Sequence, residues 1–168
     1  MKKINLLWML IFLLLSLGKG LAQQLHLVTP NTSLVLSAQE GDELKFLYYG
    51  NKMADVDRNN LWEATSSTHA AYPVYGLNCP SESALAVVHA DGNMTLQLLV
   101  DQITMTEDDV ATIAKITLKD KIYPFYVNVC YKAYKQVDII ETWTEISHAE
   151  KKNVTLNRFA SAYLPLRR

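Results

Sequence analysis

Apolar and polar residues alternate most clearly in the second half of the chain. Between residues 125 and 134, one face carries Phe125, Val127, Val129, Tyr131 and Ala133, and the other carries Tyr126, Asn128, Cys130, Lys132 and Tyr134. A period of two is typical of a β-strand, and β-branched and aromatic residues favour that conformation. The residues that follow, as far as Leu166, predict two more strands, so this stretch contains three strands in succession.

The middle strand of the three carries a tryptophan whose environment can be predicted. Val137, Ile139 and Trp143 share one parity, although Ile140 and Ile146 lie on the opposite and more polar face. We expect Trp143 to be buried between two sheets. On that basis the substitution Trp143→Ala would cost roughly 3–5 kcal/mol of stability.

Shorter apolar runs fill the first two thirds of the chain. The Asp91-Gly92 pair separates the runs 84–89 and 94–100, and because both residues tolerate positive φ it predicts a β-hairpin there. Residues 51–72 lack periodicity and predict a long loop, which in a compact domain is usually functional or disordered. Further strands are expected at residues 25–28, 34–36, 44–49 and 113–118.

The fold class follows from the number and spacing of these runs. We count about nine or ten strands, with turn residues at fairly regular intervals and no alternation of strands with helices. This pattern predicts an all-β protein, an antiparallel β-sandwich.

The amino terminus has a different pattern from the rest of the chain. Two lysines precede an unbroken apolar run from Ile4 to Leu17, and the small residues Gly20 and Ala22 follow. This order is typical of a secretory signal peptide, with cleavage after Ala22. A membrane anchor is disfavoured because the run is shorter than the roughly 20 residues that a spanning helix needs. We therefore expect a signal peptide at residues 1–22, no stable membrane anchor, and export to the periplasm or out of the cell.

Composition excludes several classes of partner. The chain has 16 basic and 17 acidic residues and a formal net charge of −1, and it has no basic patch, so we expect no nucleic-acid partner. Its four histidines are scattered singly, without metal-ligand spacing, and we expect neither a metal nor a cofactor. Cys79 and Cys130 leave two interpretations open: a disulfide in an exported protein, or two small buried residues.

Two groups of carboxylates are candidates for chemistry. Retaining hydrolysis of a glycosidic bond needs two carboxylates roughly 5–5.5 Å apart. Glu141 and Glu145 share a face with Trp143, but such a face of a sandwich is usually half exposed and carries no catalysis. Asp55 and Asp57 lie in the long loop with Trp62, and such a loop could hydrogen-bond to a sugar and stack on it. Alternatively, this loop is a solvated connector whose tryptophan packs back on the sheet.

Three stretches together resemble a known family. They are YYGNKM at residues 48–53, YPVYG at 72–76 followed by SALAVVHADGNMTLQLLV, and the run from Leu118 to Leu166. They are similar to the N-terminal β-supersandwich domain of glycoside hydrolase family 36, the α-galactosidases. The last run is the most specific, because it joins Tyr-Pro, an alternating strand, Asp-Ile-Ile-Glu, Trp and an Ala-Ser-Ala-like strand in order. The family pattern breaks at residues 77–80.

The resemblance implies that this chain is a non-catalytic domain and that catalysis belongs to a barrel domain after it. Residues 23–168 would be the N-terminal domain of an exported α-galactosidase, ending before the barrel whose two aspartates perform retaining hydrolysis. No catalytic residue is therefore assigned in this chain. In the family, the loop after the Tyr-Tyr-Gly-like strand can approach an active site, in some members that of a neighbouring subunit. Asp55 and Trp62 are accordingly the expected substrate-binding residues.

The expected partners follow from the same resemblance. They are α-galactoside oligosaccharides, bound through the barrel, and further copies of the chain in a homo-oligomer. The domain would support barrel packing, substrate access or oligomerisation. Two alternatives stay open: a free-standing secreted glycan-binding β-sandwich without hydrolase activity, and a different glycosidase family with a similar leading sandwich.

Overall fold

Strands account for all of the regular secondary structure that is described. A computed structural model of the protein describes residues 23–54, 69–76 and 82–165. Within these ranges the chain forms ten strands and no helix, and all named strand pairs are antiparallel. The predicted all-β antiparallel sandwich is confirmed. The expected signal peptide lies outside the described residues, and inside them no helix has the length and apolarity to span a membrane.

The first sheet has four strands in sequence order. They are β1 (Gln23–Val28), β2 (Thr32–Ala38), β3 (Lys45–Asn51) and β4 (His69–Ala70). Strand β2 lies between β1 and β3, and its residues from Ser33 onward are buried on both faces. This explains its apolar sequence, TSLVLSA, in which the serines are the only clear polar interruptions.

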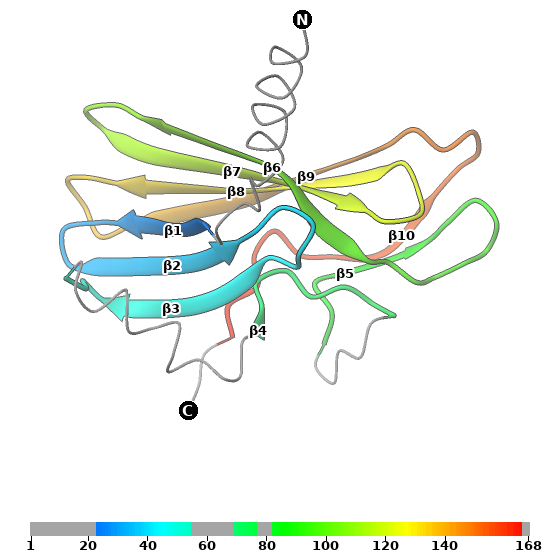
Figure 1. Ribbon diagram of the computed structural model, residues 1–168, viewed down its shortest axis with the longest axis horizontal. Coiled ribbons are helices and arrows are strands. Elements are labelled where there is room, and N and C mark those ends of the chain that lie inside the picture. The colour runs from blue at the N-terminus through cyan, green and yellow to red at the C-terminus, as the bar shows by residue number, and fades with distance from the viewer. Residues whose placement is uncertain (1–22, 55–68, 77–81, 166–168) are drawn as a thin grey trace, which may run out of the picture.

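The second sheet also follows sequence order and contains the longest strands. They are β6 (Leu98–Glu107), β7 (Ala111–Asp120), β8 (Phe125–Tyr134) and β9 (Ile140–His148). In the register of this sheet, Val129 on β8 is paired with Ile116 on β7 and with Thr144 on β9. Figure 1 shows this sheet lying across the first one, and β1 contacts both β7 and β8.

The predicted hairpin at Asp91-Gly92 is wrong in its pairing, although the turn itself forms. Gly92 has a φ of +88°, the amide of Gly92 donates to the carbonyl of His89, and the chain reverses there. However, β5 (Leu85–Val88) pairs with β10 (Thr155–Phe159) as a separate two-stranded sheet, and β6 pairs with β7. A local turn signal fixes the reversal, whereas the partners of each strand depend on the rest of the fold.

The core lies between the sheets. All five apolar residues that the alternation placed on one face of β8, from Phe125 to Ala133, are buried there, and Phe125 and Val127 are fully buried. Phe125 is the largest fully buried side chain among the described residues. The other large side chains below 2% exposure are Leu25, Leu27, Leu36, Leu85, Leu96, Ile116, Leu118, Val35, Val87 and Val100.

The prediction that Trp143 is buried between the sheets is wrong. On β9, the residues opposite the inner face of β8 are Ile140, Thr142, Thr144 and Ile146, so Trp143 lies on the outer face. It is partly exposed, while Val137 and Ile139 are 48% and 54% exposed before the strand begins. The parity argument failed because residues 137–139 belong to a turn and do not share the pleat of β9.

Candidate functional site

The two residues expected to bind substrate cannot be placed. Asp55 and Trp62 both lie outside the described residues, in the gap between Ala54 and His69. Lys52 lies shortly before this gap in the sequence. Its amide donates to the carbonyl of Asn31, and its side chain lines a hollow at this end of the molecule.

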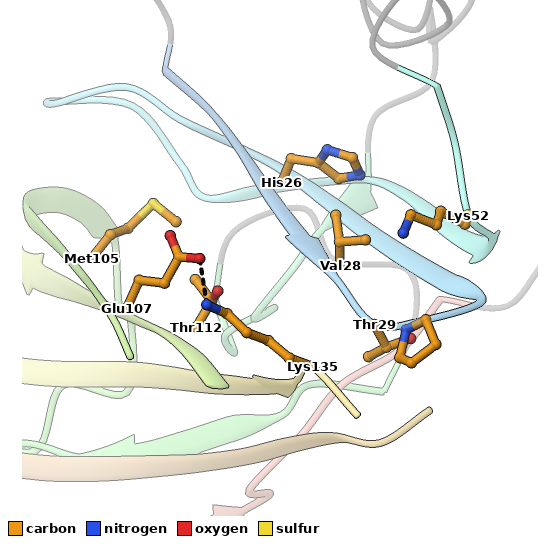
Figure 2. A pocket seen from close by; sticks show the side chains of 9 residues that line it. His26, Val28, Thr29, Lys52, Met105, Glu107, Thr112 and Lys135 are labelled. Carbon is orange, nitrogen blue, oxygen red and sulfur yellow. Dashed lines mark ion pairs between the residues drawn. The ribbon is translucent and has the colours of Figure 1, made fainter. Parts of the chain in front are cut away.

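This hollow has a volume of about 390 Å³ and forms where β1 passes the hairpin of β6 and β7. Figure 2 shows Met105, Glu107, Thr112 and Lys135 on one side, with His26, Val28 and Lys52 across from them. The inner-face positions of β6 and β7, apolar in the core, become polar here at Glu107 and Thr112. The complete lining is His26, Val28, Thr29, Pro30, Lys52, Met105, Glu107, Thr112 and Lys135.

The charged groups of the hollow are one ion pair and two further basic residues, Lys52 and His26. Glu107 Oε1 lies 2.7 Å from Lys135 Nζ, and both side chains are substantially exposed. Glu107 is the only carboxylate among the lining residues, so these residues do not supply the pair of carboxylates that glycoside hydrolysis requires.

Asp138 joins two turns of the sandwich beside the hollow by hydrogen bonds. Its carboxylate accepts hydrogen bonds from the side-chain amide and backbone amide of Asn31, each at 2.6 Å, and from Thr29 Oγ1 at 2.8 Å. These hydrogen bonds lower the pKa of Asp138 below its ordinary value, with those from Asn31 having the largest effect. The turn between β8 and β9 is thereby joined to the turn between β1 and β2.

A second group of polar residues lies on the outer face of the β6–β9 sheet. We call Lys115, Thr117, Asn128, Trp143 and Glu145 the Glu145 network. Glu145 Oε2 accepts hydrogen bonds from Lys115 Nζ at 2.7 Å and from Asn128 Nδ2 at 3.0 Å. Glu145 Oε1 accepts from Trp143 Nε1 at 3.4 Å, and Thr117 Oγ1 donates to Asn128 Oδ1 at 2.9 Å. Three neighbouring strands therefore contribute to one connected arrangement.

The electrostatics of this network keep Glu145 ionised. The hydrogen bond from Lys115, followed by those from Asn128 and Trp143, lowers the pKa of the Glu145 carboxyl. The hydrogen bond to Glu145 in turn raises the pKa of the Lys115 ammonium. A carboxylate with a lowered pKa is a poor general acid near neutral pH, so Glu145 is suited to accepting hydrogen bonds.

Cys130 lies beneath the network and is a free thiol. It is paired with Lys115 on one side and with Trp143 on the other, and it is only 1% exposed although it faces outward. Burial raises the pKa of the Cys130 thiol, and the charge of Glu145 adds to the effect. Its possible partner Cys79 lies outside the described residues.

Two tyrosines share this outer face but are partly covered. The ammonium group of Lys132 lies 4.7 Å from the ring centre of Tyr134, and that of Lys119 lies 5.9 Å from the ring centre of Tyr126. Both are cation–π contacts. Among the described residues, Trp143 is the aromatic side chain of this face that has no lysine over its ring.

A third polar group lies at one end of the molecule, with a buried pair, His89 and Glu150, and an exposed edge at Asp91. We call His89, Asp91, Asn93, Tyr123 and Glu150 the His89 cluster. His89 Nδ1 donates to Glu150 Oε1 at 2.7 Å, with side-chain exposures of 0% and 6%. The imidazole stacks on Tyr123 with ring centres 3.7 Å apart, and Tyr123 donates to Asp91 and accepts from Asn93. The cluster joins three connections that lie at one end of the molecule in Figure 1.

The charge of Glu150 is stabilised despite its position. Burial alone would raise the pKa of its carboxyl, but the hydrogen bonds from His89 and from the amide of Ala90, with the charge of nearby histidines, outweigh it and lower the pKa. The other ring nitrogen of His89, Nε2, is buried without a hydrogen-bond partner among the described residues. The hydrogen bonds of the cluster join the connection between β5 and β6 to Tyr123 and to Glu150.

Sequence reasoning identified Glu145 and Trp143 as neighbours but missed their partners. Lys115 and Asn128 lie on other strands, and only the register places them beside Glu145. His89 and Glu150 are 61 residues apart, with no local pattern that links them. Within the described ranges, no three His, Cys, Asp or Glu side chains are placed to hold a metal ion.

Comparison with known proteins identifies the family. Residues 42–168 match the sequence model described as the glycosyl hydrolase family 36 N-terminal domain. The chain belongs to glycoside hydrolase family 36. The strands that carried the resemblance in the sequence, from β3 to β10, lie within the matched residues. No curated protein matches the sequence.

Solved structures of family 36 enzymes share the fold. An α-galactosidase from Lactobacillus brevis superposes with a TM-score of 0.72 at 18% identity, covering 86% of this chain and 24% of that one. A variant of AgaA from Geobacillus stearothermophilus, solved in complex with raffinose, gives a TM-score of 0.72 at 18% identity over 83% and 24%. AgaB from the same organism gives 0.71 at 20% identity over 83% and 23%. This chain thus spans about a quarter of the length of these relatives.

Proposed function

We propose that this chain is the N-terminal, non-catalytic domain of an exported α-galactosidase. In the whole enzyme, a barrel domain outside this chain would hydrolyse terminal α-galactosides with retention of configuration. The family match and the α-galactosidase neighbours support this proposal. The signal-peptide pattern of residues 1–22 supports export.

The observation that carries the proposal is the exposed surface of β10. All five residues of this strand are exposed, and it pairs only with β5 among the described strands. Leu156 and Phe159 are 49% and 53% exposed, and they share one face of the strand because they are paired with Val87 and Leu85 on β5. Leu164, past the end of β10, is 42% exposed. Exposed apolar residues of this kind are typical of a surface that another domain covers. We assign it to the rest of the same polypeptide, which would account for a role in barrel packing.

The second support is chemical. The hollow contains a single carboxylate, and Glu145 is held ionised by its neighbours. The lining of this hollow thus offers polar groups but no acid and nucleophile pair. Raffinose and stachyose are named as bound in two structures of AgaA variants, and we propose the same substrate class for the whole enzyme here. Asp55 and Trp62 remain our proposed contacts to it, and a homo-oligomer remains the proposed assembly.

The deciding experiment is an activity assay on a chromogenic α-galactoside. The 168-residue chain is compared with a protein extended through the sequence that follows Arg168 in the gene. We expect hydrolysis only by the extended protein. Hydrolysis by neither protein, together with glycan binding by the short chain, would favour the free-standing glycan-binding sandwich instead.

The packing role has its own test in the extended protein. Phe159→Asp places a charge on the exposed surface of β10 and should lower the melting temperature of the extended protein. Thr104→Asp, on the exposed outer side of β6, is the matched control and should leave it unchanged. Equal behaviour of the two variants would show that β10 is not covered by the rest of the polypeptide.

A further inference from the structure

The outer face of β8 and β9 places an apolar ring beside groups that can bind hydroxyls. Trp143 is partly exposed there, and its indole nitrogen is directed to Glu145 two residues along the same strand. The carboxylate of Glu145 accepts hydrogen bonds from both the ammonium of Lys115 and the amide of Asn128. The face therefore combines an aromatic surface with both donors and acceptors in fixed positions.

The hydrogen bonds of the Glu145 network contribute little to the stability of the fold. Lys115 and Glu145 have side-chain exposures of 44% and 48%, and ion pairs exposed to that extent contribute little to stability. The inner face of the same strands already supplies the core through Phe125 and Val127. An ordered set of exposed groups around a partly exposed tryptophan is instead typical of a binding surface, because an indole offers a rigid apolar ring with a polar edge.

We propose that Trp143 and the Glu145 network bind a neutral saccharide that carries galactose. The axial hydroxyl of galactose leaves one side of its ring lined by C–H groups, and this side would stack on the indole of Trp143. The neighbouring hydroxyls would donate to Glu145 and accept from Lys115 and Asn128, in keeping with the donors and acceptors of these side chains. The choice of galactose rests on the proposed function, whereas the site itself rests on the geometry of this face.

The charges of the face favour a neutral ligand over an anionic one. Lys115 is neutralised by Glu145 at 2.7 Å, and Lys119 and Lys132 lie over the rings of Tyr126 and Tyr134. Glu141 accepts a hydrogen bond from Tyr134 and adds a further negative charge to the face. Three lysines therefore stand against two glutamates, and the single excess positive charge is too small to attract a polyanion strongly.

The test is native electrophoresis of the intact protein through gels that contain a polysaccharide. Galactomannan is the neutral probe, and polygalacturonate is its anionic counterpart. The variants are Trp143→Ala, Trp143→Phe and Tyr75→Ala, the last removing a 51% exposed aromatic from another part of the molecule. Circular dichroism establishes that each variant is folded. Hydrolysis of a chromogenic α-galactoside by the extended protein is measured alongside, so that failure of the proposed function is seen separately.

We expect galactomannan to retard the wild type and Tyr75→Ala equally. Trp143→Ala should weaken the retardation about tenfold or more, as truncation of a central tryptophan does at other binding surfaces, and Trp143→Phe should restore part of it. Absence of retardation of the wild type would overturn the proposal, as would equal retardation of Trp143→Ala. Retardation by polygalacturonate that disappears in high salt would also overturn it. A change of oligomeric state in Trp143→Ala with unchanged retardation would assign this face to contact between copies of the chain.

Discussion

The His89 cluster and the Glu145 network use similar chemistry in opposite surroundings. Each centres on a glutamate that accepts hydrogen bonds from a basic side chain at 2.7 Å, and each lowers the pKa of that glutamate. In the first pair the side chains are 0% and 6% exposed, and in the second they are 44% and 48% exposed. Burial is therefore the main difference between the two pairs. Removing one partner of the buried pair would leave the other uncompensated, whereas the exposed pair is open to solvent and to the ligand that we propose.

The largest effect is expected from removing the buried carboxylate. Glu150→Ala leaves His89 Nδ1 and the amide of Ala90 without their acceptor, and breaking a buried pair in this way costs roughly 3–5 kcal/mol. Urea unfolding of the intact protein measures the loss, and hydrogen exchange at the Ala90 amide reports it locally. Glu150→Gln keeps one acceptor oxygen and should cost roughly 1–2 kcal/mol. Unchanged stability in Glu150→Ala would show that the pair is not buried.

Acid should weaken the same cluster. The pKa of Glu150 is lower in the folded protein than its ordinary value of 4.5, so its contribution is present above about that pH and is lost as the pH falls through the folded pKa. The free energy of unfolding of the wild type should therefore decrease between about pH 5 and pH 3. Glu150→Gln cannot titrate and should show a shallower dependence. Identical slopes in the two proteins would contradict the assignment.

A smaller effect is expected from the exposed aromatic residue. Trp143 lies on the outer face, so Trp143→Ala should cost only about 1 kcal/mol, which is typical of a substitution that leaves no cavity. Phe125→Ala, its counterpart on the inner face of the same sheet, should cost roughly 3–5 kcal/mol. Denaturation of the two variants side by side gives the comparison. A loss of unfolding free energy in Trp143→Ala as large as that in Phe125→Ala would show that Trp143 is buried in the core.

The smallest effect is expected from the exposed carboxylate. Glu145→Gln preserves the shape of the side chain and removes the charge that pairs with Lys115. Because exposed ion pairs contribute little to stability, we expect its melting temperature to match that of the wild type, as should that of Lys115→Gln. Calorimetry checks this. A clear drop in both variants would mean that the Glu145 network stabilises the sheet and does not need a ligand to explain its order.

Local sequence patterns predicted the strands well where a single face is buried. The alternation from Phe125 to Ala133 corresponds to the buried face of β8. The same reasoning failed for Trp143, because residues 137–139 share its parity but lie in a turn. It also failed for the partner of β5, since a turn residue such as Gly92 fixes a reversal of the chain but no hydrogen-bonded partner.

The candidate sites were harder to predict than the strands. Asp55 and Trp62 came from the composition of a loop and from family resemblance, and they lie outside the described residues. The Glu145 network was only half visible, because Glu145 and Trp143 are neighbours on one strand while Lys115 and Asn128 are brought in by the register of two others. The His89 cluster gave no signal at all.

The sequence by itself determined that this protein is an antiparallel β-sandwich of family 36, because alternation and turn residues act over a few positions and the family pattern is read in order along the chain. Only the tertiary structure decided which polar groups are buried and which are exposed. Pairing between strands joins His89 to Glu150 and Lys115 to Glu145, and packing of the sheets sets their exposure. Both depend on residues that are distant in the sequence, so no local pattern encodes them.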